Sequence, residues 1–192
     1  MKKILIFLII FFSTISNISA EDIKRIIVGN EEAKITIIAF ESLTCSHCAN
    51  FHKDVYPELK KEYLDTGLAK IEFRHFPLDI AAFYASKISQ CRNDGQSDIL
   101  NSLFANQQKW VKGNSIEEAN KNLQKFLASE GFEIDFETCI NNKEIEDFVL
   151  NDRIDGAKNF KINATPTIII NDEKFENSLN YKNLKKTLEK LI

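Results

Sequence analysis

The feature that most constrains the fold is a pair of cysteines, Cys45 and Cys48, placed directly after a stretch typical of a buried strand. Residues 34–42 (KITIIAFES) are rich in β-branched and aromatic residues and are almost continuously apolar, as expected for a strand covered on both faces. Apolar residues then recur at helical spacing over residues 46–64, and residues 69–76 alternate like a second strand. This order predicts a strand–helix–strand unit with the cysteine pair at the first strand-to-helix junction.

A helical block and a returning strand complete the pattern. No convincing strand is found between residues 79 and 159, where the spacing of apolar residues predicts helices over 82–91, 97–110, 115–129 and 138–159. The strand pattern returns at residues 165–172, followed by a possible edge strand at 174–177 and an amphipathic helix over 181–192. The sequence therefore predicts an α/β fold with an all-helical insertion.

The first twenty residues differ from the rest of the chain. A cationic start (Met1-Lys2-Lys3) precedes the apolar residues 4–12, and small and polar residues follow up to Ala20. This order is typical of a secretory signal peptide, and the apolar run is shorter than the roughly 20 residues that span a bilayer. We interpret residues 1–20 as a cleaved signal peptide and expect export to the periplasm; an uncleaved anchor is the alternative.

Charge narrows the possible partners. Loss of Lys2 and Lys3 with the signal peptide would leave 23 basic and 28 acidic residues, a net charge of −5. No cluster of lysines and arginines stands out in the sequence. Nucleic acid and anionic membrane surfaces are therefore poor candidates for a partner.

All four cysteines lie in the part of the chain expected to be exported. Their even number allows two disulfides in an oxidising compartment. Cys45 and Cys48 form the natural local pair, which leaves Cys91 and Cys139 for a second bond. Two buried free thiols are the alternative for the second pair.

The position of Cys45 favours redox chemistry. The unpaired N–H groups at a helix start stabilise negative charge, and His47 between the cysteines can add a positive charge. We therefore predict a Cys45 pKa in the lower part of the ~3.5–7.5 range of activated thiols. Cys48 follows nearly one turn later and would be the more buried, resolving thiol. A stabilised thiolate is also a good leaving group, so the disulfide would act as an oxidant.

Other interpretations of the cysteine pair remain open. Half of a zinc site would need a second pair of ligands, and His52 and His75 show no ligand spacing. A structural disulfide between Cys45 and Cys48 would close a very small loop and constrain the unfolded chain little. We expect His52 to pack or to face solvent, assign no role to His75, and predict no metal site.

Two further positions could serve the cysteine pair. Thr165-Pro166 begins a predicted strand, and a proline there must avoid a position that donates a backbone hydrogen bond. A cis bond would leave the Thr165 backbone free to pair with an extended peptide, while a trans bond is the alternative. Glu41 should share a face of its strand with Ala39. We expect a solvated carboxylate at the strand end, with a proton shuttle for Cys48 as the alternative.

The quoted elements together resemble the DsbA-like thiol:disulfide oxidoreductases of the thioredoxin superfamily. The resemblance covers essentially the whole chain after residue 20, and its sharpest motifs are "TCSHCANFH" and "ATPTIII". It implies a thioredoxin-like fold with an inserted all-helical domain, formed by residues 21–78 and 154–192 with the insertion at 79–153. It also implies donation of disulfides to newly exported proteins and re-oxidation by a DsbB-like, quinone-linked membrane partner.

The resemblance assigns roles residue by residue. Cys45 matches the nucleophile and Cys48 the resolving thiol, while Ser46 and His47 match the dipeptide that tunes them. Thr165 and Pro166, named above, match the cis-proline loop that binds substrate. Some relatives carry an additional disulfide in the insertion, which here would join the remaining two cysteines.

Three departures from the family pattern concern oxidising strength and specificity. Many relatives have proline where Ser46 stands, and their buried acid lies where this chain has Ala39. Threonine before the proline, as at Thr165, also occurs in isomerase relatives.

The sequence thus predicts an exported, monomeric dithiol oxidase that needs no cofactor beyond its Cys45–Cys48 disulfide. Its substrates would be unfolded or partly oxidised exported proteins. An isomerase or reductase using the same residues is the nearest alternative. A metal-binding or metal-delivery protein is a more distant one.

Overall fold

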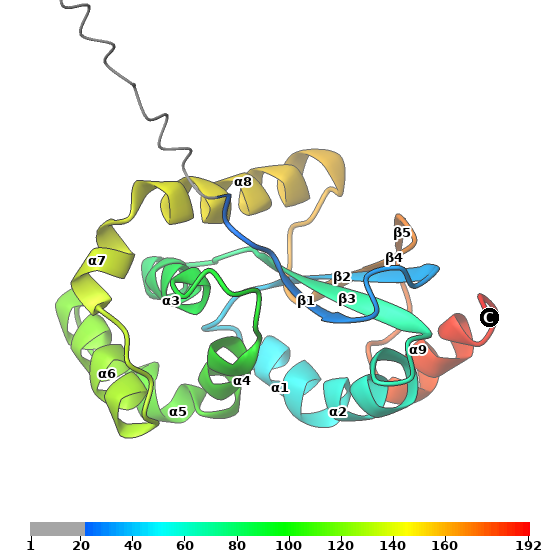
Figure 1. The fold of residues 1–192 in the computed structure, drawn as a ribbon, viewed down its shortest axis with the longest axis horizontal. Helices are drawn as coiled ribbons and strands as arrows, with labels where there is room; N and C mark the ends of the chain where they lie inside the picture. The colour runs from blue at the N-terminus through cyan, green and yellow to red at the C-terminus, as the bar shows by residue number, and fades with distance from the viewer. Residues whose placement is uncertain (1–21) are drawn as a thin grey trace, which may run out of the picture.

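The central sheet combines strands from both ends of the chain (Figure 1). The computed structural model describes residues 22–192, so the predicted signal peptide at residues 1–20 lies outside the described residues. One sheet has the order β1-β3-β2-β4-β5. The strand bounds are β1 Ile26–Gly29, β2 Ile35–Glu41, β3 Ala69–His75, β4 Thr167–Ile170 and β5 Glu173–Lys174. β2 and β3 run parallel, and the other neighbouring strands run antiparallel. In this strand order β2 lies in the middle of the sheet.

The central position of β2 explains its nearly continuous apolar sequence, because both faces of the strand are covered. Ile37 and Ala39 belong to the main core beneath α1 (Ser46–Asp54). Phe40 belongs to a smaller core on the other face, covered by α8 (Lys143–Asn159). Gly156 permits this close approach, since a Cβ at that position would lie 2.8 Å from the Phe40 ring.

The helix that follows the cysteine pair is interrupted, whereas the sequence predicts one helix over residues 46–64. The structure has α1, then α2 (Tyr56–Leu59), then a π-helical turn η1 (Lys60–Leu64). Pro57 lies in the first turn of α2 and has no N–H to donate to the preceding turn, so the backbone departs from helical geometry at Val55.

The insertion is helical, as predicted, but two of the predicted helices, over residues 97–110 and 138–159, are each divided in two. The helices of the insertion are α3 (Ile80–Gln90), α4 (Asp98–Ala105), α5 (Gln107–Trp110), α6 (Ile116–Ser129), α7 (Phe136–Asn141) and the beginning of α8. Asn106 separates α4 from α5, and Asn142 separates α7 from α8. The Asn142 side chain accepts a hydrogen bond from the N–H of Ile145 at 3.0 Å. This cap begins α8, and α7 ends at the preceding residue.

α8 links the insertion to the returning part of the sheet. It runs without interruption across positions 153 and 154, where the sequence prediction divided the two domains. The chain then enters β4 and β5 and ends with α9 (Tyr181–Leu188), which packs against α2 on the face of the sheet that α1 also covers (Figure 1). None of the helices in residues 22–192 has both the length and the apolar character that a bilayer crossing requires.

Within the insertion, a disulfide joins Cys91, at the end of α3, to Cys139 in α7. The two Cα atoms lie 5.5 Å apart, and 48 positions of sequence separate them. Cys45 and Cys48 are unbonded, so the structure represents the reduced state of that pair.

Candidate active site

Cys45 occupies the N-cap position of α1, immediately after the loop that leaves β2. Its N–H donates to the carbonyl of Ser42 at 3.0 Å, and its carbonyl accepts from the N–H of Ala49 at 3.2 Å. The side chain of Cys45 is partly exposed, whereas Cys48, one turn later, is completely buried. Ser46 is exposed in the first turn of the helix. The geometry therefore presents one sulfur to an incoming molecule and hides the other.

The surroundings of Cys45 favour its thiolate. The largest effect is a hydrogen bond from the Cys48 thiol, and together with weaker donors it lowers the pKa of Cys45 to about 5. Partial burial opposes this shift, while the Thr165 side chain and the backbone N–H groups of Cys48 and His47 reinforce it. His47 thus lowers the pKa of Cys45 through its backbone N–H, and not through the imidazole charge that was expected from the sequence.

The pKa of Cys48 is shifted in the opposite direction, upward. Burial, first, and then the hydrogen bond to Cys45 and the negative charge of Glu41 raise the pKa of the Cys48 thiol. Cys48 therefore keeps its proton near neutral pH while Cys45 is charged. This difference makes Cys45 the sulfur that reacts with an external partner.

The Thr165–Pro166 peptide bond, which the sequence left open, is cis in the structure. The carbonyl of Thr165 lies 3.3 Å from the Cys45 sulfur and accepts a hydrogen bond from its thiol. Thr165 is 9% exposed, and its buried hydroxyl has no hydrogen-bond partner other than Cys45 among residues 22–192. The loop before β4 thus lies directly against the reactive sulfur.

Glu41 corrects an expectation, because it is 4% exposed rather than solvated. Its two carboxylate oxygens lie 2.9 and 3.1 Å from Nε2 of His52, whose ring stacks on Phe104 with 4.1 Å between centroids. Burial raises the pKa of Glu41, and His52 opposes that rise. β2 extends through Glu41, so its side chain points toward the face covered by α1, and His52 meets it there.

This pair could have been found in the sequence from two spacings. Glu41 lies two positions after Ala39 and therefore on the same face of the strand. His52 lies four positions after Cys48 and so follows it along the buried side of the helix. The expectation failed because a carboxylate at a strand end is usually solvated when no partner is in view.

His75 also has a structural role that the sequence did not indicate. Its Nε2 lies 3.2 Å from the Gln90 side-chain oxygen, and its backbone N–H donates to Asp152 at 2.9 Å. Arg25 makes two hydrogen bonds to the same carboxylate, at 2.8 and 2.9 Å. Burial lowers the pKa of His75, so the ring is neutral within this network. The network joins β1, β3, α3 and α8, which sequence reasoning could not bring together.

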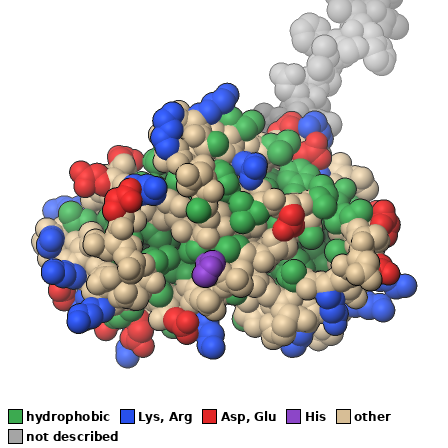
Figure 2. All heavy atoms as spheres, turned by 180° about the vertical axis from the view of Figure 1, so that it is seen from behind, with side chains coloured by type: hydrophobic (Ala, Val, Ile, Leu, Met, Phe, Trp, Pro, Cys, Tyr) green, Lys and Arg blue, Asp and Glu red, His purple; other side chains and the backbone are tan. Residues whose placement is uncertain are grey.

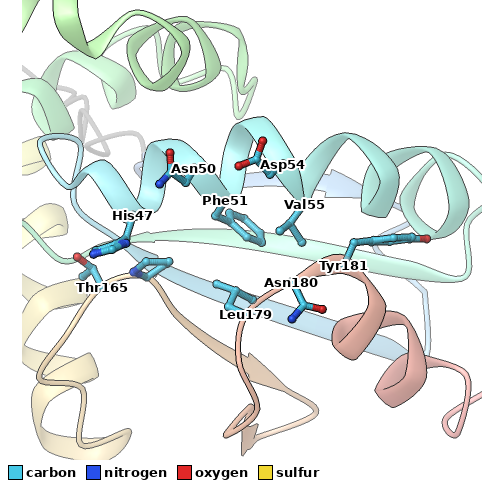
Figure 3. Close-up of a pocket in the computed structure, with 10 residues that line it drawn as sticks. His47, Asn50, Phe51, Asp54, Val55, Thr165, Leu179, Asn180 and Tyr181 are labelled. Atoms are coloured by element: carbon cyan, nitrogen blue, oxygen red, sulfur yellow. The ribbon is translucent and has the colours of Figure 1, made fainter.

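A groove of about 520 Å³ extends along α1 from the Thr165–Pro166 loop, which lies against the reactive cysteine (Figure 3). His47 and Thr165 lie at one end, and Tyr181 of α9 lies at the other. Apolar side chains form much of its lining, contributed by Phe51, Val55, Pro166 and Leu179. The groove is therefore open to an extended chain that passes over Cys45.

The surface around the site carries few charges. Figure 2 shows an exposed histidine surrounded mainly by apolar and uncharged groups, with most charged side chains toward the edges of that face. Among the described residues, His47 is the one exposed histidine. Within residues 22–192, no three histidine, cysteine, aspartate or glutamate side chains are arranged to hold a metal ion.

Comparisons with known proteins agree with this geometry. A thioredoxin family model matches residues 21–190. The chain is 28% identical over 175 residues to disulfide bond formation protein D of Bacillus subtilis, covering 85% of this chain and 75% of that protein. It is 27% identical over 173 residues to a Rickettsia prowazekii protein assigned by its name to the protein-disulfide oxidoreductases, covering 89% of this chain. The chain spans 54–62% of the length of three such rickettsial relatives.

Comparison with solved structures also identifies proteins of disulfide formation as similar to this chain. The crystal structure of alpha-DsbA1 from Wolbachia pipientis superposes with a TM-score of 0.77 at 30% identity, covering 87% of this chain and 90% of that one. The oxidised form of BdbD from Bacillus subtilis superposes with a TM-score of 0.69 at 28% identity, covering 86% and 91%. The predicted thioredoxin-like α/β fold is confirmed. The chain therefore belongs to the thioredoxin family and, within it, to the DsbA-like proteins.

Proposed function

We propose that this protein is an exported thiol:disulfide oxidoreductase that donates the Cys45–Cys48 disulfide to other exported proteins. One observation carries the proposal: a partly exposed cysteine with a pKa lowered to about 5 lies next to a buried cysteine whose pKa is raised. A metal ligand or a structural disulfide needs no such difference between its two sulfurs. A nucleophile and its resolving partner do need it.

The reaction begins with the disulfide form. A substrate thiolate attacks Sγ of Cys45, the Cys45–Cys48 bond breaks, and Cys48 leaves and takes up a proton. A second substrate thiolate then attacks the substrate sulfur of the mixed disulfide, and Cys45 leaves as a thiolate. The substrate has lost two electrons and gained a disulfide, and the protein has become a dithiol.

The direction of transfer follows from the stability of the Cys45 anion. Reduction yields a thiolate that several hydrogen bonds stabilise, so the reduced protein is favoured and the disulfide is readily given away. Burial of Cys48 adds a second effect, since an external thiol can reach only Cys45. The stabilised thiolate supports oxidase activity over reductase activity, and the burial of Cys48 makes Cys45 the point of attack in either direction.

The remaining parts of the proposal rest on the resemblance to DsbA-like proteins. Residues 1–20 would direct the chain to the periplasm, where it would act as a monomer on unfolded or partly oxidised proteins. Thr165 and Pro166 would hold the substrate backbone across Cys45. A DsbB-like, quinone-linked membrane protein would remove the two electrons and restore the disulfide, so no bound cofactor is needed.

Two assays on the protein without residues 1–20 test this function. We expect oxidised protein to form disulfides in reduced ribonuclease, and the Cys45→Ser variant to be inactive. Equilibration with glutathione buffers should give a Cys45–Cys48 disulfide that is less stable than the disulfides formed in the ribonuclease. Strong activity on scrambled ribonuclease with little oxidation of the reduced enzyme would instead support an isomerase.

A further inference from the structure

The groove beside Cys45 has different chemistry at its two ends. One end is formed by His47 and the Thr165–Pro166 loop, whose Thr165 carbonyl contacts the reactive sulfur, and the opposite end is bordered by Asp54 and Tyr181 (Figure 3). If a substrate lies along this groove, as the proposed function requires, the far end meets residues some distance from the substrate cysteine. The side chains at that end can therefore select among substrates.

Asp54 belongs to a polar stripe along the rim of the groove. His47, Asn50 and Asp54 are spaced by three and then four residues, which places them on one side of α1 (Figure 3). The stripe begins at the cysteine and ends at a carboxylate. Between them, Phe51 and Val55 provide the apolar wall of the groove.

The Asp54 carboxylate is free to meet a ligand. It is exposed, and it makes neither an ion pair nor a side-chain hydrogen bond with any residue in the described part of the chain. Lys53, the neighbouring cation, lines a different cavity on the other side of α1. Across the groove, Lys185 of α9 is already paired with Glu62 at 2.7 Å.

A second carboxylate extends the negative region. Burial, first, and then Glu62 raise the pKa of Tyr181, which lines the groove, and the charge of Glu58, four residues after Asp54, adds to this rise. Among the groove-lining residues Asp54 is the only carboxylate, and no lysine or arginine is present. The lining at the far end therefore carries one negative charge, that of Asp54.

An independent observation shows that the other end of the groove is prepared for a polar ligand. Thr165 lines it, and its 9% exposed side chain carries a hydroxyl that no described residue apart from Cys45 satisfies. Buried hydroxyl groups are ordinarily hydrogen-bonded. In the disulfide form Cys45 has no thiolate to accept from this hydroxyl, so a peptide backbone crossing Cys45 would supply its partner.

The distance between the two ends sets the spacing in the ligand. Asp54 lies nine positions after Cys45, which corresponds to about 13–14 Å along a helix that rises about 1.5 Å per residue. An extended peptide covers that length in about four residues, at about 3.3 Å each. Residues four apart in an extended chain point to the same side, so both would face the protein.

We propose that the preferred substrates carry a lysine or arginine about four residues from the cysteine that attacks Cys45, and that Asp54 selects this cation. Exposed ion pairs contribute little, so the selection is a preference and not an absolute requirement. We expect about a two- to fivefold difference in rate between a peptide with and one without the cation. Added salt should reduce the difference.

The test uses single-cysteine peptides that differ only at the fourth residue before or after the cysteine, as Lys, Gln or Glu. Oxidised protein without residues 1–20 is mixed with excess peptide, and loss of the Cys45–Cys48 disulfide is followed by alkylation of quenched samples. Two peptide molecules are joined by a disulfide while the protein takes up the two electrons. The same rates are measured for Asp54→Asn and for Glu133→Gln, which removes one exposed carboxylate outside the groove.

The expected result is a rate order of Lys, then Gln, then Glu in one of the two peptide series. Asp54→Asn should remove most of this order, and Glu133→Gln should leave it intact. Because each peptide is compared across protein variants, effects of the added charge on the peptide's own thiol cancel. An order that survives in Asp54→Asn overturns the inference.

The two proposals fail differently. Equal oxidation of all peptides by wild-type protein would refute the selection of cations but leave the oxidase function standing. Failure to oxidise any peptide, including the Gln series, would refute the oxidase function itself. Loss of activity in Asp54→Asn toward the Gln peptide would also count against the inference, since Asp54 should affect only charged substrates.

Discussion

At the scale of single residues, the charge on Cys45 gives the most direct prediction. Ultraviolet absorbance of the thiolate in reduced protein should titrate with a midpoint near pH 5, because hydrogen bonds hold the pKa of Cys45 at about 5. An unperturbed thiol would titrate with a midpoint at about pH 8.5. The Cys45→Ser variant, as a control, should lack this transition.

The same hydrogen bonds should make the stability of the reduced form depend on pH. A group whose pKa is lowered on folding stabilises the protein above its unfolded pKa, and this stabilisation is lost as pH falls through its folded pKa. Reduced protein should therefore lose stability relative to oxidised protein between about pH 8.5 and pH 5. A difference in melting temperature between the two forms that does not change over this range would contradict the assignment.

The hydrogen bond from Cys48 can be tested separately. It is the largest cause of the low pKa of Cys45, so Cys48→Ala should move the thiolate midpoint upward, although Cys45 remains at the helix start. Thiolate absorbance measures this shift directly. An unchanged midpoint would mean that the backbone N–H groups of the first turn are sufficient by themselves.

The Glu41–His52 pair predicts an unusual response to acid. In His52→Phe, an aromatic ring still fills the space between Phe73 and Phe104, but the buried carboxylate loses its partner. We expect a loss of about 3–5 kcal/mol in the free energy of unfolding near neutral pH. Because burial raises the pKa of Glu41, protonation should restore part of this stability as pH falls toward that pKa.

The double variant Glu41→Gln/His52→Phe serves as the control, since it has no buried charge to protonate. It should be more stable than His52→Phe alone at neutral pH, and it should not gain stability on mild acidification. Urea unfolding at several pH values measures all three proteins. Equal pH dependence in the single and double variants would show that Glu41 is not charged in the folded protein.

At the scale of elements, Asp79 connects the active-site loop to the insertion. Its carboxylate caps α3 by accepting from the N–H of Ala82 at 2.8 Å, and it also accepts from the hydroxyl of Thr44 at 2.6 Å. Asp79→Ala should lower the free energy of unfolding by about 1–2 kcal/mol, because both donors lose their acceptor. Asp79→Asn should retain most of the wild-type free energy of unfolding, since asparagine caps helices almost as well as aspartate. Thermal unfolding of the two variants distinguishes them.

The elements also show what could be predicted from the sequence. Periodicity located the strands and the helical insertion, because burial on a sheet or a helix face imposes its own spacing. It did not locate the breaks at Asn106 and Asn142, where the apolar spacing continues across the junction. The break at Asn142 depends on a side-chain cap, which periodicity does not contain.

The residues of the candidate site also fall into those that the sequence indicated and those that it did not. Cys45, Cys48, Thr165 and Pro166 were found because their chemistry depends on residue type at fixed positions. The free carboxylate at the far end of the groove was missed because it depends on which face of α1 meets the sheet. The Glu41–His52 pair was missed although its spacings were available, because a carboxylate at a strand end is usually solvated. Contacts between distant segments, such as His75 with Gln90 and Asp152, lie beyond what local spacing can indicate.

At the scale of the whole molecule, one continuous core joins the sheet to the insertion. Ile37 and Leu59 near the sheet belong to the same buried cluster as Leu103, Leu123 and Phe126 of the insertion. α8 contacts both β3 and α3, so no boundary in the described chain is free of shared packing. A single core of this kind favours one cooperative unfolding transition.

The Cys91–Cys139 disulfide tests this cooperativity. It closes a loop of 48 positions, and the chain-entropy model gives such a bond a stabilisation of about 4 kcal/mol. In a background of Cys45→Ser and Cys48→Ser, replacing Cys91 and Cys139 with alanine should lower the free energy of unfolding by up to this amount. Since the core is shared, we expect the loss to move a single urea transition seen equally by circular dichroism and by Trp110 fluorescence. Two separated transitions would instead mean that the insertion unfolds as a domain of its own, and that the bond stabilises only that domain.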